Sequence, residues 1–146
     1  HWDLTQKRPL GRLRPFVTEM DRNNPMVGFS EDPLIWSDVE GWRRLREKIN
    51  IPMVMHVPQL GGLQEVIRGV ADIYMIGGRI GETMAAGMAY GRANVQCLIQ
   101  QSGNELMRAL TLHQAAVLPT ASVHEVALTA ERGRVTRCWP LVSEEG

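Results

Sequence analysis

The sequence has 146 residues, of which 44% are apolar and 22% charged, and its 16 basic and 16 acidic residues leave no net charge. This length corresponds to one domain, and the apolar fraction is typical of a globular protein rather than a disordered chain. Zero net charge argues against a protein that coats nucleic acid or binds a membrane surface, because both need a basic excess. No apolar run approaches the roughly 18 residues that span a bilayer. The two cysteines, Cys97 and Cys138, form neither a CxxC nor a zinc pattern, so we expect a reducing, cytoplasmic compartment.

Short apolar runs alternate with longer amphipathic segments along the chain. We expect helices near residues 37–49, 63–70, 82–90 and 105–118, and in the first of them Ser37 and Glu40 have the spacing of a capping box. The expected strands are residues 26–29, 52–56, 72–76 and 95–99. This alternation is typical of an α/β protein with a parallel sheet that is buried on both faces.

The βα units repeat at roughly 22–25 residues, which is the step of a (β/α) barrel. A full barrel needs about 250 residues, so the sequence predicts either a partial TIM-like (β/α) barrel or a small open α/β sheet. We assign residues 1–122 to the barrel domain. Residues 123–128 and 134–138, around Gly133, predict a short C-terminal hairpin within the tail 123–146. Because half a barrel leaves two strand edges unpaired, we expect a homo-oligomer or packing against a missing N-terminal segment.

Polar residues at the carboxyl ends of the expected strands are the candidates for a functional site, because ligands bind at that end in both architectures. Glu31 and Asp32 follow the first strand and precede Pro33. Carboxylates placed there suit a hard cation such as Mg²⁺, or they form a solvated turn that caps the next helix. His56 closes the second strand, as a ligand, an acid–base group or a hydrogen-bonded strand end. Glu125, in the tail, is a buried acid at a strand tip or a solvated strand residue.

The segment Gly77-Gly78-Arg79-Ile80-Gly81 faintly resembles a phosphate-binding loop that opens a helix. Its spacing is G-G-x-x-G rather than G-x-G-x-x-G, so a tight strand-to-helix turn is the alternative. If a phosphate bound there, the chain would be a free-standing flavodoxin-like domain.

Five short motifs follow one another in an order that is specific when taken together. They are residues 29–34 (FSEDPL), 51–55 (IPMVM), 71–74 (ADIY) with 79–82 (RIGE), 112–116 (LHQAA), and Pro119 followed by Glu125. In this order and spacing, over about residues 1 to 140, the chain resembles the C-terminal barrel domain of the mandelate racemase/muconate lactonizing enzyme branch of the enolase superfamily.

The resemblance implies a barrel with a separate capping domain and a Mg²⁺ held by three carboxylates on successive strands. It also implies bases that abstract the proton α to a carboxylate, with hydroxy acids and sugar acids as typical substrates. Glu31 corresponds to the second metal ligand, and the first would precede His1. The third falls at Val57, which cannot ligate a metal. The neighbouring His56 would take its place, as a ligand or an acid–base group. Glu125 corresponds to an acidic residue near the substrate carboxylate.

Two positions at which the resemblance implies bases fall at Gly77 and Gln100, neither of which can abstract a proton. The sequence therefore predicts a Mg-dependent sugar-acid dehydratase (a lyase) or an epimerase (an isomerase) in which several site residues are replaced. The alternative is a non-catalytic barrel fragment with a structural or assembly role. The expected ligand is a small carboxylate, and neither nucleic acid nor a membrane is an expected partner.

Overall fold

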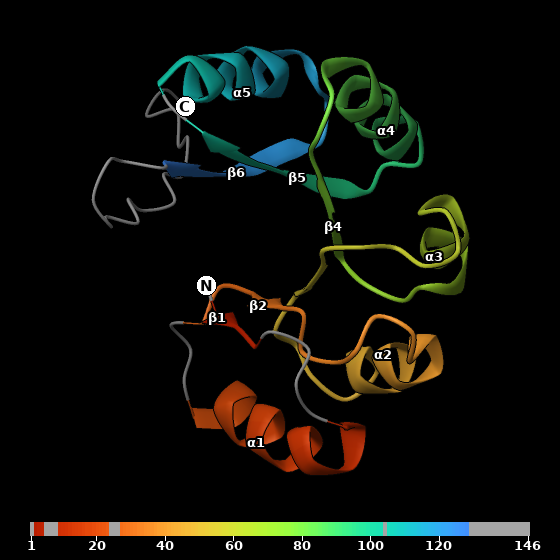
Figure 1. Ribbon diagram of the computed structural model, residues 1–146. Coiled ribbons are helices and arrows are strands. Elements are labelled where there is room, and N and C mark those ends of the chain that lie inside the picture. The colour runs from red at the N-terminus through yellow and green to blue at the C-terminus, as the bar shows by residue number, and fades with distance from the viewer. Residues whose placement is uncertain (1, 5–8, 24–26, 104, 129–146) are drawn as a thin grey trace, which may run out of the picture. The chain divides into compact units, whose positions relative to one another are not determined.

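The computed structural model describes residues 2–4, 9–23, 27–103 and 105–128, apart from the side chains of residues 2, 102 and 122–128. Contacts between residues divide the chain into two units, His1–Tyr74 and Met75–Gly146, with the boundary inside strand β4 (Ile73–Ile76). In each unit, parallel strands alternate with helices, as Figure 1 shows. The expected α/β class and partial TIM-like architecture are therefore confirmed.

The first unit holds a parallel sheet whose strands follow one another in chain order. Strand β1 (Trp2–Asp3) pairs with β2 (Ser30–Glu31), β2 pairs with β3 (Met53–Met55), and β3 pairs with the start of β4. The register places Asp3 opposite Glu31 and Glu31 opposite Val54. Since the strands run in the same direction, their carboxyl ends lie along one edge of the sheet.

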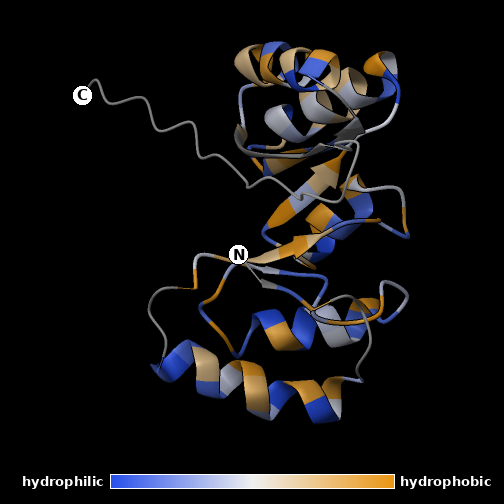
Figure 2. Ribbon diagram, turned by 60° about the vertical axis from the view of Figure 1, so that its left-hand side comes forward, coloured by the Kyte–Doolittle hydropathy of each residue, from blue (hydrophilic) through white to orange (hydrophobic). Residues whose placement is uncertain are grey.

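Three helices accompany these strands: α1 (Leu10–Asn23), α2 (Val39–Arg46) and α3 (Leu63–Arg68). Each long helix buries one stripe, and Figure 2 shows apolar and polar residues alternating along α1. The buried residues of α1 and α2 are Leu13, Val17 and Met20, then Gly41, Trp42 and Leu45. Every residue of β3 is buried, as expected for a parallel strand covered on both faces. Among the described residues, no helix is both long and apolar enough to cross a membrane.

Three expectations for the first unit need correction. The strand expected at residues 26–29 is β2, and it lies later, so that Glu31 belongs to the strand itself. The side chain that caps α2 is Asp38, which accepts a hydrogen bond from the Gly41 N–H at 2.9 Å, whereas Ser37 was expected. Strand β1 and helix α1 were not expected at all.

The second unit continues the βα alternation after β4. It contains α4 (Ile80–Arg92), β5 (Gln96–Gly103), α5 (Glu105–Val117) and β6 (Ala121–Leu128). Strands β5 and β6 are parallel, and their register runs from Cys97 opposite Ala121 to Gly103 opposite Leu128. The expected first strand of the C-terminal hairpin is therefore part of β6. Its second strand, at 134–138, lies outside the described residues, so the hairpin stays a prediction.

Carboxylates anchor the start of β3, the strand that leads to His56. One oxygen of Asp21, on α1, accepts hydrogen bonds from the N–H groups of Asn50 and Ile51, each at 3.0 Å. Asp72, just before β4, accepts from the Met53 N–H at 2.9 Å. These bonds satisfy backbone donors at the start of β3 and just before it, and they fix where the strand begins.

Candidate metal centre

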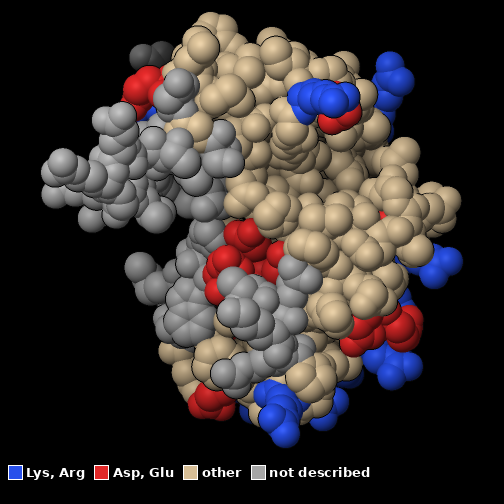
Figure 3. All heavy atoms as spheres, viewed as in Figure 1, with Lys and Arg blue, Asp and Glu red and all other residues tan. Residues whose placement is uncertain are grey.

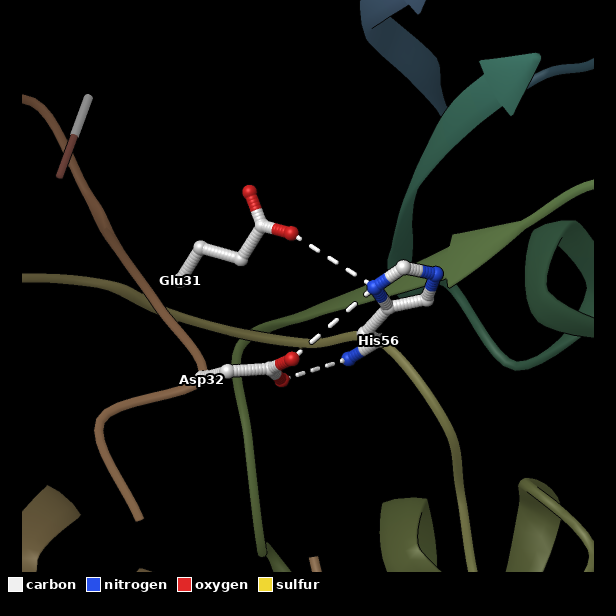
Figure 4. A group of neighbouring side chains, drawn as sticks. All are labelled: Glu31, Asp32 and His56. Atoms are coloured by element: carbon white, nitrogen blue, oxygen red, sulfur yellow. Dashed lines mark hydrogen bonds and ion pairs between the residues drawn. The ribbon is translucent and has the colours of Figure 1, made fainter. Parts of the chain in front are cut away.

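Three side chains from neighbouring strand ends converge in the first unit: Glu31, Asp32 and His56 (Figure 4). Glu31 ends β2, Asp32 follows it, and His56 comes directly after β3. The His56 Nδ1 atom lies 3.6 Å from Glu31 Oε1 and 3.8 Å from Asp32 Oδ2. One donor atom from each residue lies within 4.8 Å of the other two. The parallel register thus brings together residues that are far apart in the sequence.

The backbone at Asp32 adopts an uncommon conformation that turns its side chain toward β3. Its φ angle is +43°, in the left-handed region, which aspartate tolerates better than most residues. Its N–H donates to the Val54 carbonyl at 3.0 Å, and its Oδ1 accepts from the His56 N–H at 3.0 Å. Pro33 follows and adds its own restriction on the residue before it. Strain of this kind is common at functional sites and requires support from surrounding bonds such as these.

The His56 ring is oriented from two sides. Its backbone N–H is held by Asp32, and the edge of its ring contacts Trp36, with the ring centroids 5.9 Å apart at 62°. The His56 side chain is 39% exposed, whereas the side chains of Glu31 and Asp32 are 5% and 4% exposed. The site is therefore a pair of buried carboxylates beside a partly exposed imidazole.

Burial raises the pKa of the Asp32 carboxyl above its usual value, and the neighbouring Glu31 carboxylate adds to the rise. The His56 N–H, the Trp36 side chain and the His56 imidazole act in the opposite direction. Two adjacent buried carboxylates are costly unless a positive charge balances them. In Figure 3, acidic side chains gather on the surface over β1 and β2, and the Lys and Arg side chains lie elsewhere on this face. The electrostatics therefore favour a bound cation.

The donor set fits a divalent cation but not Mg²⁺ in particular. Two carboxylate oxygens are ligands that Mg²⁺ prefers, whereas an imidazole nitrogen is a ligand typical of Zn²⁺, Fe²⁺, Ni²⁺ and Cu²⁺. Within the part of the chain that the structure describes, the cluster of Glu31, Asp32 and His56 could hold the ion, with His56 contributing Nδ1.

The sequence alone did not single out two acidic residues of this strand edge as ligands. Asp32 was named beside Glu31 as a strand-end carboxylate suited to a hard cation, but only Glu31 was assigned as a ligand. Asp3 ends β1 in register with Glu31, although the first acidic ligand was expected before His1. The Asp3 side chain is exposed and belongs to the same strand edge.

Val57 and Gly77 are positions at which the resemblance implies functional side chains that the sequence lacks, and the structure agrees with their loss. Val57 is 37% exposed and has no ligating atom. In the second unit, a Cβ atom on Gly77 would lie 2.3 Å from the Gln100 carbonyl oxygen, so no side chain fits there. Gln101, beside it, donates from Nε2 to the Gly78 carbonyl at 3.2 Å. Packing between β4 and β5 thus requires glycine where the resemblance implies a base.

Glu125 lies on β6, opposite Gln100 of β5. Its side chain is not among those described, so its proximity to a substrate carboxylate stays a prediction. Of the three residues expected to form the site, the structure brings together Glu31 and His56.

No protein-family model and no curated protein sequence matches the chain. Many solved structures share its fold. A dipeptide epimerase from Cytophaga hutchinsonii, complexed with Mg and the dipeptide D-Ala-L-Val, matches with a TM-score of 0.73 at 13% identity, over 85% of this chain and 35% of that one. The 3,6-anhydro-D-galactonate cycloisomerase from Zobellia galactanivorans matches with a TM-score of 0.73 at 16% identity, over 89% and 38%. The L-Ala-D/L-Glu epimerase from Bacillus subtilis gives 0.73 at 16%, over 84% and 36%.

These neighbours are enolase-superfamily barrels. The chain shares their fold. At these identities the likeness concerns the fold alone, and the chain spans only about a third of the length of the solved structures it matches.

Proposed function

We propose that this chain forms part of a divalent-cation-dependent enzyme of the enolase-superfamily type, which acts at the carbon next to a carboxylate in a small acid. An epimerase or a dehydratase of a sugar acid is the reaction class that we favour. The observation that carries the proposal is the convergence of Glu31, Asp32 and His56 at the carboxyl ends of parallel strands. In (β/α) barrels that edge is where active sites lie.

The proposed roles of the three residues follow from their positions. Glu31 and Asp32 would hold the cation through the oxygens that face His56, and His56 would complete the set through Nδ1. A bound divalent cation supplies positive charge that stabilises negative charge developing on a substrate carboxylate. Asp32 has a second task, because its Oδ1 holds the His56 N–H and thereby keeps the imidazole beside the carboxylates.

The proposal extends to the groups that would handle the substrate. Glu125 would lie near the substrate carboxylate, and the proton-abstracting base would come from a position other than Gly77, where no side chain fits. The substrates of the epimerases and the cycloisomerase named above support a small carboxylate as the ligand. A homo-oligomer, or packing against a further segment of the polypeptide, would cover the open strand edges.

The first test is cation binding by the full chain. We expect wild-type protein to bind one equivalent of Mn²⁺, because Mn²⁺ accepts both carboxylate and imidazole ligands. The loss of the EPR signal of the free ion measures this binding. Glu31→Gln should abolish this binding. Glu40→Gln, which changes an exposed carboxylate on α2, is the matched control and should bind like wild type.

If wild-type protein binds no Mn²⁺, or if Glu31→Gln binds it as well as wild type, the enzyme proposal is rejected. The non-catalytic barrel fragment with an assembly role would then be favoured.

A further inference from the structure

We propose that the Glu31–Asp32–His56 cluster binds a divalent ion of the first transition series, from Fe²⁺ to Zn²⁺, in preference to Mg²⁺. This inference rests on the proposed function, in which the same cluster binds a divalent cation. It departs from the Mg²⁺ that the sequence resemblance implies, and the departure comes from a single donor atom, His56 Nδ1.

The chemistry of the donors provides the first argument. Mg²⁺ prefers six oxygen ligands in a nearly ideal octahedron and gives up its water reluctantly. Imidazole is a good ligand for Zn²⁺ and Fe²⁺, and the affinity of mixed nitrogen and oxygen sites rises along the series from Mn²⁺ toward Cu²⁺. Replacing the third carboxylate by His56 therefore lowers the affinity for Mg²⁺ relative to the affinity for the ions from Fe²⁺ to Zn²⁺.

The distances provide the second argument. Ligands about 2.1 Å from a common ion lie about 3.0 Å apart at right angles and about 3.4 Å apart in a tetrahedron. The His56 Nδ1 atom is 3.6 Å from the Glu31 oxygen and 3.8 Å from the Asp32 oxygen. A closure of a few tenths of an ångström would bring His56 Nδ1 to tetrahedral coordination spacing from each of the two carboxylate oxygens, and three protein ligands leave room for water or substrate.

The anchoring of His56 provides the third argument. Its backbone N–H is bonded to Asp32 Oδ1, and its ring contacts the Trp36 ring. The loop after it is held by Glu65, a fully buried carboxylate that accepts from the N–H groups of Leu60 and Gly62. A ligand whose backbone and ring are both held loses little freedom when it binds an ion, which favours affinity.

The cluster has two alternative states, and the test distinguishes both from the one proposed. In the first, the His56 imidazole pairs with both carboxylates and leaves no cation site. In the second, a Mg²⁺ binds the carboxylates while the imidazole stays aside.

The test is a pair of calorimetric titrations, with Zn²⁺ and with Mg²⁺, on the full chain. We expect Zn²⁺ to bind more tightly than Mg²⁺, and His56→Ala to weaken Zn²⁺ binding at least about tenfold, since even indirect supports of a ligand contribute that much. Mg²⁺ binding should not change in this variant. His113→Ala, which removes an exposed histidine on α5, controls for adventitious Zn²⁺ and should match wild type.

A second readout uses Co²⁺, whose visible spectrum reports nitrogen ligation. Wild-type protein should give a spectrum that His56→Gln, a variant that keeps polarity and approximate size, shifts toward that of an all-oxygen site. The inference is overturned if the ratio of Zn²⁺ to Mg²⁺ affinity is the same in wild type and both His56 variants. In that case Mn²⁺ binding that depends on Glu31 would still support the proposed function, whereas failure of all the ions to bind would overturn both.

Discussion

At the scale of single residues, Tyr74 is a titratable group whose environment departs far from water. It lies on β4, its side chain is fully buried, and its hydroxyl oxygen accepts a hydrogen bond from the Ala71 N–H at 3.3 Å. Burial raises the pKa of Tyr74 to about 12, with a smaller rise from the buried Glu65 carboxylate. The folded protein thus holds the phenol proton more tightly than the unfolded chain, in which the pKa is near 10.0.

The pKa difference predicts a loss of stability in alkali. The contribution of Tyr74 to the free energy of unfolding is fully present below pH 10. It falls as the pH rises toward 12, because the unfolded chain releases the phenol proton first. Two pKa units correspond to about 2.7 kcal/mol at most. Urea unfolding at pH 9 and at pH 11.5 should show this fall in wild type.

The matched variant is Tyr74→Phe, which removes the ionisable group and keeps the ring. At pH 9 we expect it to be less stable by about 1 kcal/mol, because the Ala71 N–H loses its acceptor. Between pH 9 and pH 11.5 its stability should fall less than that of wild type. Equal losses in the two proteins would contradict the assigned pKa.

At the scale of elements, helix α4 makes a close approach to the Leu118 side chain at Gly87. A Cβ atom on Gly87 would lie 2.5 Å from a methyl group of Leu118, just after α5, whereas one on Gly81, in the first turn of α4, would meet nothing within 4 Å. The close contact at Gly87 joins the helix to the end of α5.

We predict that Gly87→Ala and Gly81→Ala have opposite effects on the free energy of unfolding. Both variants gain helix propensity, by about 1 kcal/mol at most. At Gly87 the clash with Leu118 should outweigh that gain and lower stability by about 1–2 kcal/mol. Thermal unfolding of the two variants measures the difference, and adding Leu118→Val to Gly87→Ala should recover part of the loss. A stabilising Gly87→Ala would show that the two helices are packed less closely.

The elements also differ in how well the sequence reveals them. Helix α1 was missed because Pro15 lies inside it and is read as a helix breaker. It is stabilised by burial of Leu13, Val17 and Met20, at helical spacing on one face. Strand β1 has two residues, too few for any periodic pattern, and only its pairing with β2 defines it.

At the scale of the whole molecule, the candidate metal centre couples cation binding to folding. Its ligands come from separate strands, so the site forms only when the sheet of the first unit is in place. A cation that binds the folded chain therefore stabilises it by mass action. With Mn²⁺ at 100 times its dissociation constant, the free energy of unfolding should rise by about 2.7 kcal/mol.

Differential scanning calorimetry with and without Mn²⁺ measures this shift, and a chelator should reverse it. Glu31→Gln should unfold at the same temperature in both conditions. If Mn²⁺ raises the unfolding temperature of Glu31→Gln as much as that of wild type, the stabilisation does not come from this cluster.

The sequence by itself determined the alternation of strands and helices, the α/β class, and Glu31 and His56 as candidates. These follow from local hydrophobic patterns and from polar residues at strand ends, which depend on neighbours along the chain. Only the tertiary structure decided that His56 Nδ1 faces both carboxylates, that Asp32 joins them, and that the Gln100 carbonyl leaves Gly77 no room for a side chain. These outcomes depend on the register of parallel strands. That register is specified when the strand faces are buried in the core, so it depends on packing between segments that lie far apart in the chain.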